Sequence, residues 1–349
     1  MAGLAGAVSA AAPAQHEAIH LQWRAFSFPL PAPLVTAAGA LTHRRGWLLR
    51  LRTASGALGW GEASPLASGA AAAQARQACE RAMGRLGPRL ARGELERALP
   101  SLPPALAFAL GGALAEADGL VGSAAGGWRA APASAWLLPA GEEALAAARR
   151  ILGASPSASL APGVVPTFKW KVGVHPAPLE RAWFQRLAGL CPRGARLRLD
   201  ANGGLDRATA WSWVEALAGD GRLEWFEQPL DPADHGGLET LAERVPVALD
   251  ESLGQRPELR CRWPGWQVRR PSQEGDPRPL LRQLGDGRPW LMVSTSFETG
   301  IGARWIAHLA ALQAAGPTPT APGLAPGWGP ADALASAEPR VVWHAAGEA

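Results

Sequence analysis

The segment Thr-Phe-Lys-Trp-Lys-Val-Gly (TFKWKVG, 167–173) decides the fold. Successive side chains of an extended strand point to opposite faces. Lys169 and Lys171 therefore share one face, and the apolar residues beside them share the other. Under a layer of helices the apolar face would be buried, and both ammonium groups would point to the interior or the mouth of a barrel. An ordinary half-exposed strand with a solvated lysine face gives the same pattern, so the rest of the sequence must distinguish the two structures.

Six other short apolar segments, from residue 134 onward, also have the character of strands. Each ends in a turn or cap signal and is followed by a helical stretch, such as 207–217 or 301–314. Repeated strand–helix units predict a parallel sheet, and seven or eight of them predict a barrel. No GxGxxG motif follows any of these strands, which disfavours a dinucleotide-binding fold. The six segments are SAWLLP (134–139), LRLDANG (197–203), LEWFEQPL (223–230), VALDESL (247–253), WQVRRPS (266–272) and LMVSTSFETG (291–300).

The first third of the chain has a different pattern. Residues 19–65 are expected to form strands, and the alanine-rich residues 70–122 are expected to form helices. The small residues at 122–134 predict a linker, and the Pro- and Ser-rich stretch 152–166 predicts a surface loop. The expected fold class is therefore α/β, a (β/α)7β TIM-type barrel with an N-terminal α+β capping domain. We expect a disordered extension at 1–18, the capping domain at 19–125, the modified TIM barrel at 126–325 and a C-terminal segment at 326–349 that returns to the capping domain.

The composition excludes several classes of protein. Hydrophobic residues make up 48% of the 349, which is enough for a sizeable core. The net charge of +4 comes from arginines spread along the chain, without the basic patch of a nucleic-acid-binding protein. Cys79, Cys191 and Cys261 lack CxxC spacing, so neither a disulfide framework nor a zinc site is expected. No stretch is apolar for the length of a membrane span, and the first seventeen residues lack the basic start of a secretory signal. The expected compartment is the cytoplasm, and the sequence gives no indication of an oligomeric state.

A bias in the composition points to the residues that carry chemistry. The 34 basic residues include only two lysines, Lys169 and Lys171, and Asn202 is the single asparagine. Arginine has replaced lysine elsewhere, so a functional reason is favoured where lysine and asparagine persist. The two lysines lie two residues apart, and two amines held so close repel each other when both are charged, which lowers the pKa of one of them. A lysine that is neutral near pH 7 is a competent general base.

Three carboxylates follow the lysines at regular spacing. Asp200, Glu227 and Asp250 each end an expected strand, about one strand–helix unit apart. In a barrel the carboxyl ends of consecutive strands meet at the active-site face, so the three side chains would converge there. Converging carboxylates repel one another unless a cation lies between them, and oxygen ligands without His or Cys fit Mg²⁺ better than zinc. Individually, each acid could instead be a solvated side chain or a helix cap.

A base that faces a divalent metal suggests removal of a proton next to a carboxylate, with the metal stabilising the enediolate. On these motifs the sequence resembles the enolase superfamily. GWGEASPL (59–66), KxK (169–171), DAN (200–202), FEQP (226–229) and LDES (249–252) follow in the family order. The resemblance implies that Lys171 is the catalytic base and Lys169 its partner. It also implies that Asp200, Glu227 and Asp250 bind Mg²⁺, with Mn²⁺ as an alternative.

Within the superfamily, RRPSQEG (269–275) and STSFETGIG (294–302) look most like the o-succinylbenzoate synthase family of menaquinone and phylloquinone biosynthesis. That family dehydrates a cyclohexadiene dicarboxylate. Relatives usually present Lys-Pro on the sixth strand, whereas this chain has Arg270 before Pro271. Arginine does not deprotonate in practice, so it cannot be the second base of a racemase or epimerase. A one-base dehydration survives, because Arg270 can still stack on the ring or balance the charge of the enolate.

Two residues beside the expected metal site have weaker signals. Asn202 lies two residues after Asp200, so it is expected on the same face, next to a ligand or a metal-bound water. Glu251 follows Asp250 directly and could orient Lys171 or the metal site. It could equally be an acid that starts a helix.

Contacts with the substrate are expected from two further places. Ser294, Thr295 and Ser296 end the seventh strand and either donate hydrogen bonds to a substrate carboxylate or serve the turn. The segment GALTHRRG (39–46) could extend over the barrel mouth and bring Arg44 or Arg45 near an anionic substrate.

The sequence thus predicts an Mg²⁺-dependent enzyme, a hydro-lyase that acts on a small-molecule dicarboxylate without nucleic-acid or membrane partners. The nearest rivals are other enzymes of the same superfamily, namely a muconate-type cycloisomerase, an acylamino-acid racemase or a dipeptide epimerase. A catalytically impaired barrel that acts as a binding protein is the rival from another class, suggested by the missing lysine of the sixth strand.

Overall fold

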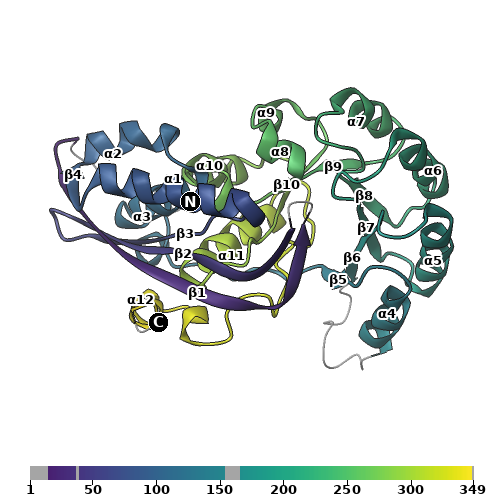
Figure 1. Ribbon diagram of the computed structural model, residues 1–349, viewed down its shortest axis with the longest axis horizontal. Coiled ribbons are helices and arrows are strands. Elements are labelled where there is room, and N and C mark those ends of the chain that lie inside the picture. Colours follow the sequence, from purple (N-terminus) through teal and green to yellow (C-terminus); the bar gives the residue numbers. More distant parts are fainter. Residues whose placement is uncertain (1–14, 37–38, 154–165, 348–349) are drawn as a thin grey trace, which may run out of the picture.

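A computed structural model of the chain describes residues 15–36, 39–153 and 166–347 and contains two separate sheets (Figure 1). Most of the extension expected at 1–18 and most of the loop expected at 152–166 lie outside the described residues. The disorder expected for the last residues of the extension is wrong. Gln15 and Glu17 accept backbone hydrogen bonds from Gly93 and Arg92, at 2.8 Å each, which fixes this stretch against the first domain.

The first sheet is antiparallel, with the strand order β3-β2-β1-β4. Its long hairpin confirms the strands expected within residues 19–65, whereas the short β4 was not expected. Helices within the expected helical region cover one face of this sheet, and their apolar residues form one core with it. The elements are β1 (Ala18–Thr36), β2 (Gly39–Thr53), β3 (Leu58–Ala63), β4 (Arg89–Ala91), α1 (Gly69–Leu86), α2 (Arg92–Ala98) and α3 (Pro104–Ala117), with short 3-10 helices at Leu99–Ser101 and Ser123–Ala125.

The second sheet has seven parallel strands in the order β11-β10-β9-β8-β7-β6-β5. All seven coincide with the segments expected from the sequence. The strands are β5 (Trp136–Leu138), β6 (Thr167–Lys171), β7 (Arg196–Asp200), β8 (Leu223–Glu227), β9 (Val247–Leu249), β10 (Trp266–Arg269) and β11 (Leu291–Val293). The helices between them are α4 (Glu143–Gly153), α5 (Ala177–Leu190), α6 (Arg207–Leu217), α7 (His235–Ala242), α8 (Glu251–Gln255), α9 (Leu259–Arg262), α10 (Arg278–Gly285) and α11 (Gly300–Ala314), with a 3-10 helix at Pro271–Gln273.

The parallel sheet curls as a half-barrel, with its helices on the outer side (Figure 1). The regular sheet stops at seven strands, but backbone bonds continue at both edges. Gly323 forms a parallel bridge with Ser294 beside β11, and Ala135, just before β5, donates to the carbonyl of Pro322 at 2.9 Å. A short extended segment around residue 323 therefore contacts both edges of the sheet.

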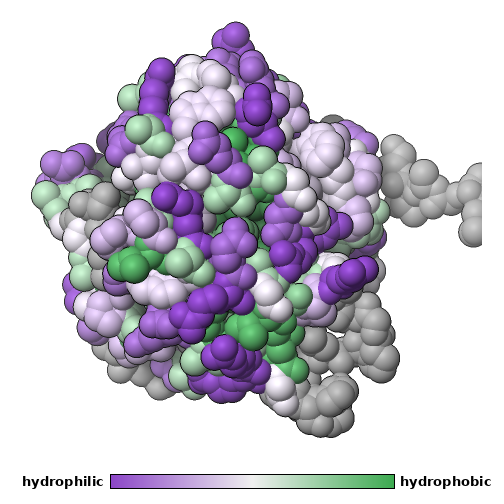
Figure 2. All heavy atoms as spheres, turned by 90° about the vertical axis from the view of Figure 1, so that its right-hand side faces the viewer, coloured by the Kyte–Doolittle hydropathy of each residue, from purple (hydrophilic) through white to green (hydrophobic). Residues whose placement is uncertain are grey.

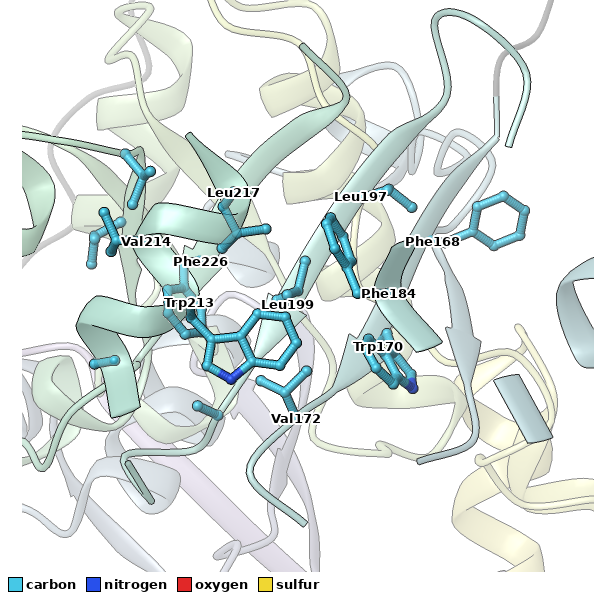
Figure 3. Packing of buried hydrophobic residues seen from close by; sticks show 14 of the residues in the cluster. Phe168, Trp170, Val172, Phe184, Leu197, Leu199, Trp213, Val214, Leu217 and Phe226 are labelled. Carbon is cyan, nitrogen blue, oxygen red and sulfur yellow. The ribbon is translucent and has the colours of Figure 1, made fainter. Parts of the chain in front are cut away.

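The alternation in β6 places its residues as the sequence predicts. Phe168 and Trp170 are buried in the core between the sheet and the outer helices, where Trp213 of α6 packs against Trp170 (Figure 3). Lys169 and Lys171 point to the opposite, inner side and are half-buried. The strand is thus held by its apolar face, and its charged face is available to the interior.

The C-terminal part of the chain packs against the antiparallel sheet. Helix α12 (Pro339–Ala345) follows a 3-10 helix at Ala333–Ala335 and lies beneath β1 (Figure 1). Its Val342 and Trp343 share an apolar cluster with residues of β1 and β2, and Arg24 of β1 donates to the Trp343 carbonyl at 2.8 Å. This cluster covers the sheet face that α1 to α3 leave open.

The outer helices present a mainly hydrophilic surface interspersed with small apolar areas (Figure 2). Among the described residues, no helix combines the length and the apolar character that a membrane crossing requires.

Candidate active site

The inner face of β6 meets the ends of the next two strands through Lys169. Its Nζ lies 2.7 Å from Asp200 Oδ2 at the end of β7 and 2.6 Å from Glu227 Oε1 at the end of β8. Trp225 holds the second Glu227 oxygen, because its indole N–H donates to Oε2 at 3.2 Å. Three strand ends that are distant in sequence are thereby joined by one ammonium group.

Lys171 lies at the end of β6, in register with Asp200 of the neighbouring strand. Its side chain is half-buried and forms no ion pair among the described residues. The two lysines therefore differ in their surroundings, since Lys169 is fixed between two carboxylates and Lys171 is available to another group at the mouth.

Asp250, which follows β9, has a different cation beside it. Arg270, which follows β10, donates from Nε to Asp250 Oδ1 at 3.0 Å and from Nη2 to Oδ2 at 2.6 Å. Its Nη1 donates to the carbonyl of Thr295 at 2.9 Å, beyond the end of β11. This fork geometry fixes the plane of the guanidinium group, which a lysine in its place would not do.

Asn202 and Glu251 extend the cluster on the side of Asp200. The Asn202 amide donates to Glu251 Oε1 at 3.1 Å, and its backbone N–H donates to Asp200 Oδ1 at 3.0 Å. Asn202 has φ 45°, a left-handed conformation that asparagine tolerates better than most residues. Glu251 is also the first residue of α8, as one of the two roles considered for it from the sequence requires, and its side chain contacts Asn202.

Gln228 is a supporting residue that the sequence reasoning did not single out. Its Oε1 accepts hydrogen bonds from the backbone N–H groups of Asp250 and Ser252, at 3.2 and 3.1 Å, and its own φ is 37°. It therefore fixes the backbone that carries Asp250. The signal was present in the FEQP motif, where the glutamine follows Glu227 directly.

Burial and crowding shift the pKa values of the cluster. Burial, with smaller contributions from neighbouring carboxylates, raises the pKa of Glu227 to about 7 and that of Glu251 to about 8. Burial alone would raise the pKa of Asp250, but the Arg270 guanidinium group holds it below its usual range. Burial would likewise lower the pKa of Lys169, yet Asp200 and Glu227 raise it. The lowered pKa expected for one of the two lysines is therefore not that of Lys169, because the carboxylates beside it raise its pKa.

The donor chemistry of the cluster fits Mg²⁺. As the side chains lie, no three ligand-type residues in the described part of the chain form a compact metal cluster, since Lys169 and Arg270 engage the three carboxylates. With Glu251, the cluster has four carboxyl groups against the two cations that engage them, so a divalent cation would offset the excess of carboxyl groups. The buried Glu251 Oε2 also has no hydrogen-bond partner among the described residues. Carboxylate oxygens are the ligands that Mg²⁺ prefers.

Comparison with known proteins identifies the family. Residues 156–261 match the family model described as enolase C-terminal domain-like. The chain is 36% identical over 300 residues to an o-succinylbenzoate synthase of Thermosynechococcus vestitus, covering 82% of this chain and 87% of that protein. The chain belongs to the o-succinylbenzoate synthase family of the enolase superfamily.

Solved structures agree with this assignment. The o-succinylbenzoate synthase from Thermosynechococcus elongatus BP-1, complexed with Mg in its active site, is similar with a TM-score of 0.76 and 31% identity, covering 93% of this chain and 99% of that one. A dipeptide epimerase from Enterococcus faecalis V583, complexed with Mg and L-Leu-L-Tyr, has a TM-score of 0.68 at 21% identity, covering 88% and 90%. The second likeness shows the shared fold alone. The chain is thus an enzyme of a hydro-lyase family.

The three hydroxyl groups after β11 have different environments in this o-succinylbenzoate synthase family member. Ser294 donates to the Gly323 carbonyl at 3.2 Å, and Thr295 donates to Glu298 Oε2 at 2.5 Å. Thr295 thus has its partner within the turn, whereas the partner of Ser294 belongs to the extended segment around residue 323. The buried Ser296 hydroxyl has no partner among the described residues.

The expectation that Arg44 reaches the substrate is wrong. Its buried guanidinium group donates to the carbonyls of Ser64 and Pro65, at 2.7 and 2.8 Å, within the first domain. The neighbouring Arg45 is exposed.

Proposed function

We propose that this chain dehydrates 2-succinyl-6-hydroxy-2,4-cyclohexadiene-1-carboxylate to 2-succinylbenzoate in an Mg²⁺-dependent reaction of menaquinone or phylloquinone biosynthesis. The observation that carries the proposal is the inner face of β6, where Lys169 is fixed between Asp200 and Glu227 while Lys171 is left without an ion pair among the described residues. One amine that is free to exchange a proton suits a reaction with one base.

In this mechanism the neutral Lys171 amine removes the proton from the carbon next to the substrate carboxylate. The electron pair of that C–H bond moves into the carboxylate group and then returns to form a ring double bond as the C–O bond of the hydroxyl group breaks. The ammonium group of Lys171 gives its proton to the departing oxygen, so water leaves and the ring becomes aromatic. The same residue is first base and then acid.

Asp200, Glu227 and Asp250 would hold Mg²⁺, with Asn202 and Glu251 supporting them. Mg²⁺, when bound, supplies positive charge beside the substrate carboxylate. Arg270 adds a second positive charge near Asp250 but, as an arginine, no second base. This favours dehydration over racemisation or epimerisation, which need a base on each face of the reacting carbon.

The domain division belongs to the same proposal. We infer that residues 19–125 form a capping domain, that residues 126–325 form a modified TIM barrel and that residues 326–349 return to the cap. The bonds of Pro322 and Gly323 to both edges of the parallel sheet support a short eighth strand that closes the barrel. Such a barrel has its active site at the carboxyl ends of its strands, where Lys171 and the carboxylates lie.

The direct test is turnover of the cyclohexadiene dicarboxylate with Mg²⁺ and again after EDTA. We expect metal-dependent formation of 2-succinylbenzoate. Lys171→Ala should lower kcat by roughly 10²–10⁴-fold, the usual contribution of a general base. Lys171→Arg is the matched control, because it keeps the positive charge and most of the length but cannot act as a base at neutral pH. Full activity of Lys171→Arg would disprove the assigned base.

The rivals predict different results. Incorporation of solvent deuterium at the α-carbon of a dipeptide or acylamino acid, without dehydration, would support an epimerase or racemase. Absence of turnover in a folded, Mg²⁺-binding protein would support the binding-protein alternative. Turnover that is lost in Lys171→Ala while the fold persists excludes that alternative.

A further inference from the structure

The GWGEASPL motif of the first domain contacts the strand ends of the second domain through one glutamine. Gln273, in the 3-10 helix that follows Arg270, accepts a hydrogen bond from the Leu66 backbone N–H at 2.8 Å. Its amide nitrogen donates to the Ser64 carbonyl at 3.0 Å. Both hydrogen-bonding groups of the side chain are therefore used across the two domains. Within the first domain, Arg44 donates to the same Ser64 carbonyl and so also fixes this backbone.

Glu62 of the same motif makes a second contact with the other domain. Its buried Oε2 accepts hydrogen bonds from the backbone and the hydroxyl of Thr299, at 2.9 and 2.5 Å, and from the Gly302 N–H at 3.1 Å. The approach is close, since a Cβ added to Gly302 would lie 2.8 Å from Glu62 Oε2 and 2.7 Å from Glu298 Cβ. Glu62 and Glu298 thus flank the first turn of α11.

Glu298 joins the ends of β10 and β11. Its Oε1 accepts from the Ser272 hydroxyl at 2.6 Å, and its Oε2 accepts from the Thr295 hydroxyl at 2.5 Å. Gln273 contributes here as well, because its amide nitrogen lies 3.1 Å from Ser272 Oγ. Ser272 and Thr295 both lie near Arg270: Ser272 follows it by two residues in the sequence, and the carbonyl of Thr295 accepts a hydrogen bond from its Nη1.

These contacts form a continuous path of hydrogen bonds from the cap to the guanidinium group at the barrel mouth. We propose that Gln273 is a positioning residue, which couples the cap segment Ser64–Leu66 to the ends of β10 and β11 beside Arg270 and so fixes the guanidinium orientation. Its role in turnover rests on the proposed function, whereas the orientation itself does not. In a rigid site, a displacement of about 1 Å can cost on the order of 100-fold in rate.

A role of Gln273 that is limited to holding the two domains together would give a different kinetic result. If the glutamine only held the domains together, its loss would loosen the cap and raise KM. If it positions Arg270 for the charge that develops during the reaction, its loss lowers kcat and kcat/KM together. The split between kcat and KM therefore separates the two roles.

The experiment compares Gln273→Ala with Gln267→Ala in the Mg²⁺-bound enzyme. Gln267 is a matched control, because it is a buried glutamine at the other end of β10 whose amide donates to the carbonyls of Arg260 and Trp263 within the same domain. We expect kcat to fall roughly tenfold to 100-fold in Gln273→Ala, with KM little changed. In Gln267→Ala we expect kcat to stay at the wild-type value. In an Arg270→Met background, Gln273→Ala should lower kcat no further.

A second readout does not depend on turnover. The Arg270 Nε–H signal in a nitrogen-15 NMR spectrum is identified by its loss in Arg270→Lys. We expect it to shift or broaden in Gln273→Ala and to stay in place in Gln267→Ala. If Gln273→Ala does not fold, Gln273→Glu replaces it, since glutamate keeps the acceptor for Leu66 but loses the donor to Ser64.

The two measurements distinguish a failure of this inference from a failure of the proposed function. An unchanged Arg270 signal in the Gln273 variant overturns the inference, whether or not the protein turns over. A changed signal with unaltered kcat, or with a rise in KM alone, also overturns it as a positioning role. A wild-type protein without turnover disproves the proposed function, while a changed signal would still support the link between Gln273 and Arg270.

Discussion

Both ends of the parallel sheet bury charges, but they balance them differently. Toward the amino ends of the strands, Arg198 of β7 lies 2.6 Å from Glu224 of β8 and stacks over Trp225 at 4.0 Å. Arg198 also donates to the Thr320 hydroxyl and the Ala321 carbonyl, at 2.6 and 2.7 Å. The charge of Arg198 is thus balanced by one carboxylate, and its other hydrogen bonds go to neutral groups.

At the carboxyl ends of the same strands, the carboxyl groups are in excess. Lys169 and Arg270 face Asp200, Glu227, Asp250 and Glu251. Burial, with smaller contributions from the neighbouring carboxylates, raises the pKa values of Glu227 and Glu251. This difference indicates that the Arg198–Glu224 pair stabilises the fold, whereas the cluster with excess carboxyl groups is suited to bind a further cation.

The largest expected effect is on the balanced side. Glu224→Gln leaves the Arg198 side chain buried without its carboxylate partner, so the free energy of unfolding should fall by about 3–5 kcal/mol. The affinity for Mg²⁺ should stay at the wild-type value, because Glu224 lies at the other end of its strand from Glu227. Denaturant unfolding and calorimetric Mg²⁺ titration measure the two quantities. A loss of Mg²⁺ affinity without a loss of stability would contradict the structural role assigned to Glu224.

The matched change on the unbalanced side is Glu227→Gln, three residues along the same strand. Removing one proposed ligand should weaken Mg²⁺ binding by at least on the order of 100-fold, about 2.7 kcal/mol. The metal-free protein should lose less stability than Glu224→Gln, because Lys169 keeps Asp200 as a partner. Calorimetric titration of both variants under one buffer condition gives the contrast. Equal Mg²⁺ affinity in wild type and Glu227→Gln would exclude Glu227 as a ligand.

The sequence predicted the parallel part of the fold well because its signals were local. The alternation in residues 167–173 and the apolar segments that follow specify strands, and α6 runs from Arg207 to Leu217 as expected. Strand β4 was missed because its three residues, Arg89–Ala91, have no alternation that could be recognised. Its pairing with Ala18 and Ile19 is a long-range contact, which no local pattern encodes.

The candidate site shows the same limit. The positions of Lys169, Asp200 and Glu227 followed from strand ends, so their convergence could be predicted. The pKa of Lys169 could not, since its direction depends on distances of less than 3 Å to two carboxylates. The contacts of Arg44 were also unpredictable, because the backbone carbonyls that it binds belong to a neighbouring turn.

Glu62 sharpens the comparison because it is a buried carboxyl group with hydrogen bonds but no ion pair among the described residues. Burial, and then the charge of Glu298, raise its pKa to about 8 from an ordinary value near 4.5, although Thr299 and Arg44 act in the opposite direction. A carboxyl group whose pKa is raised by folding contributes stability that is present below about pH 4.5 and is lost as the pH rises through about 8.

The change that isolates this group is Glu62→Gln, which keeps an acceptor for Thr299 and Gly302 but cannot ionise. Between pH 6 and pH 8 the stability of the variant should therefore rise relative to wild type, by on the order of 2 kcal/mol. Urea unfolding of both proteins across this range measures the difference. Parallel stability curves would mean that Glu62 ionises as easily in the folded chain as in the unfolded one, and that three hydrogen bonds at the start of α11 replace the missing cation.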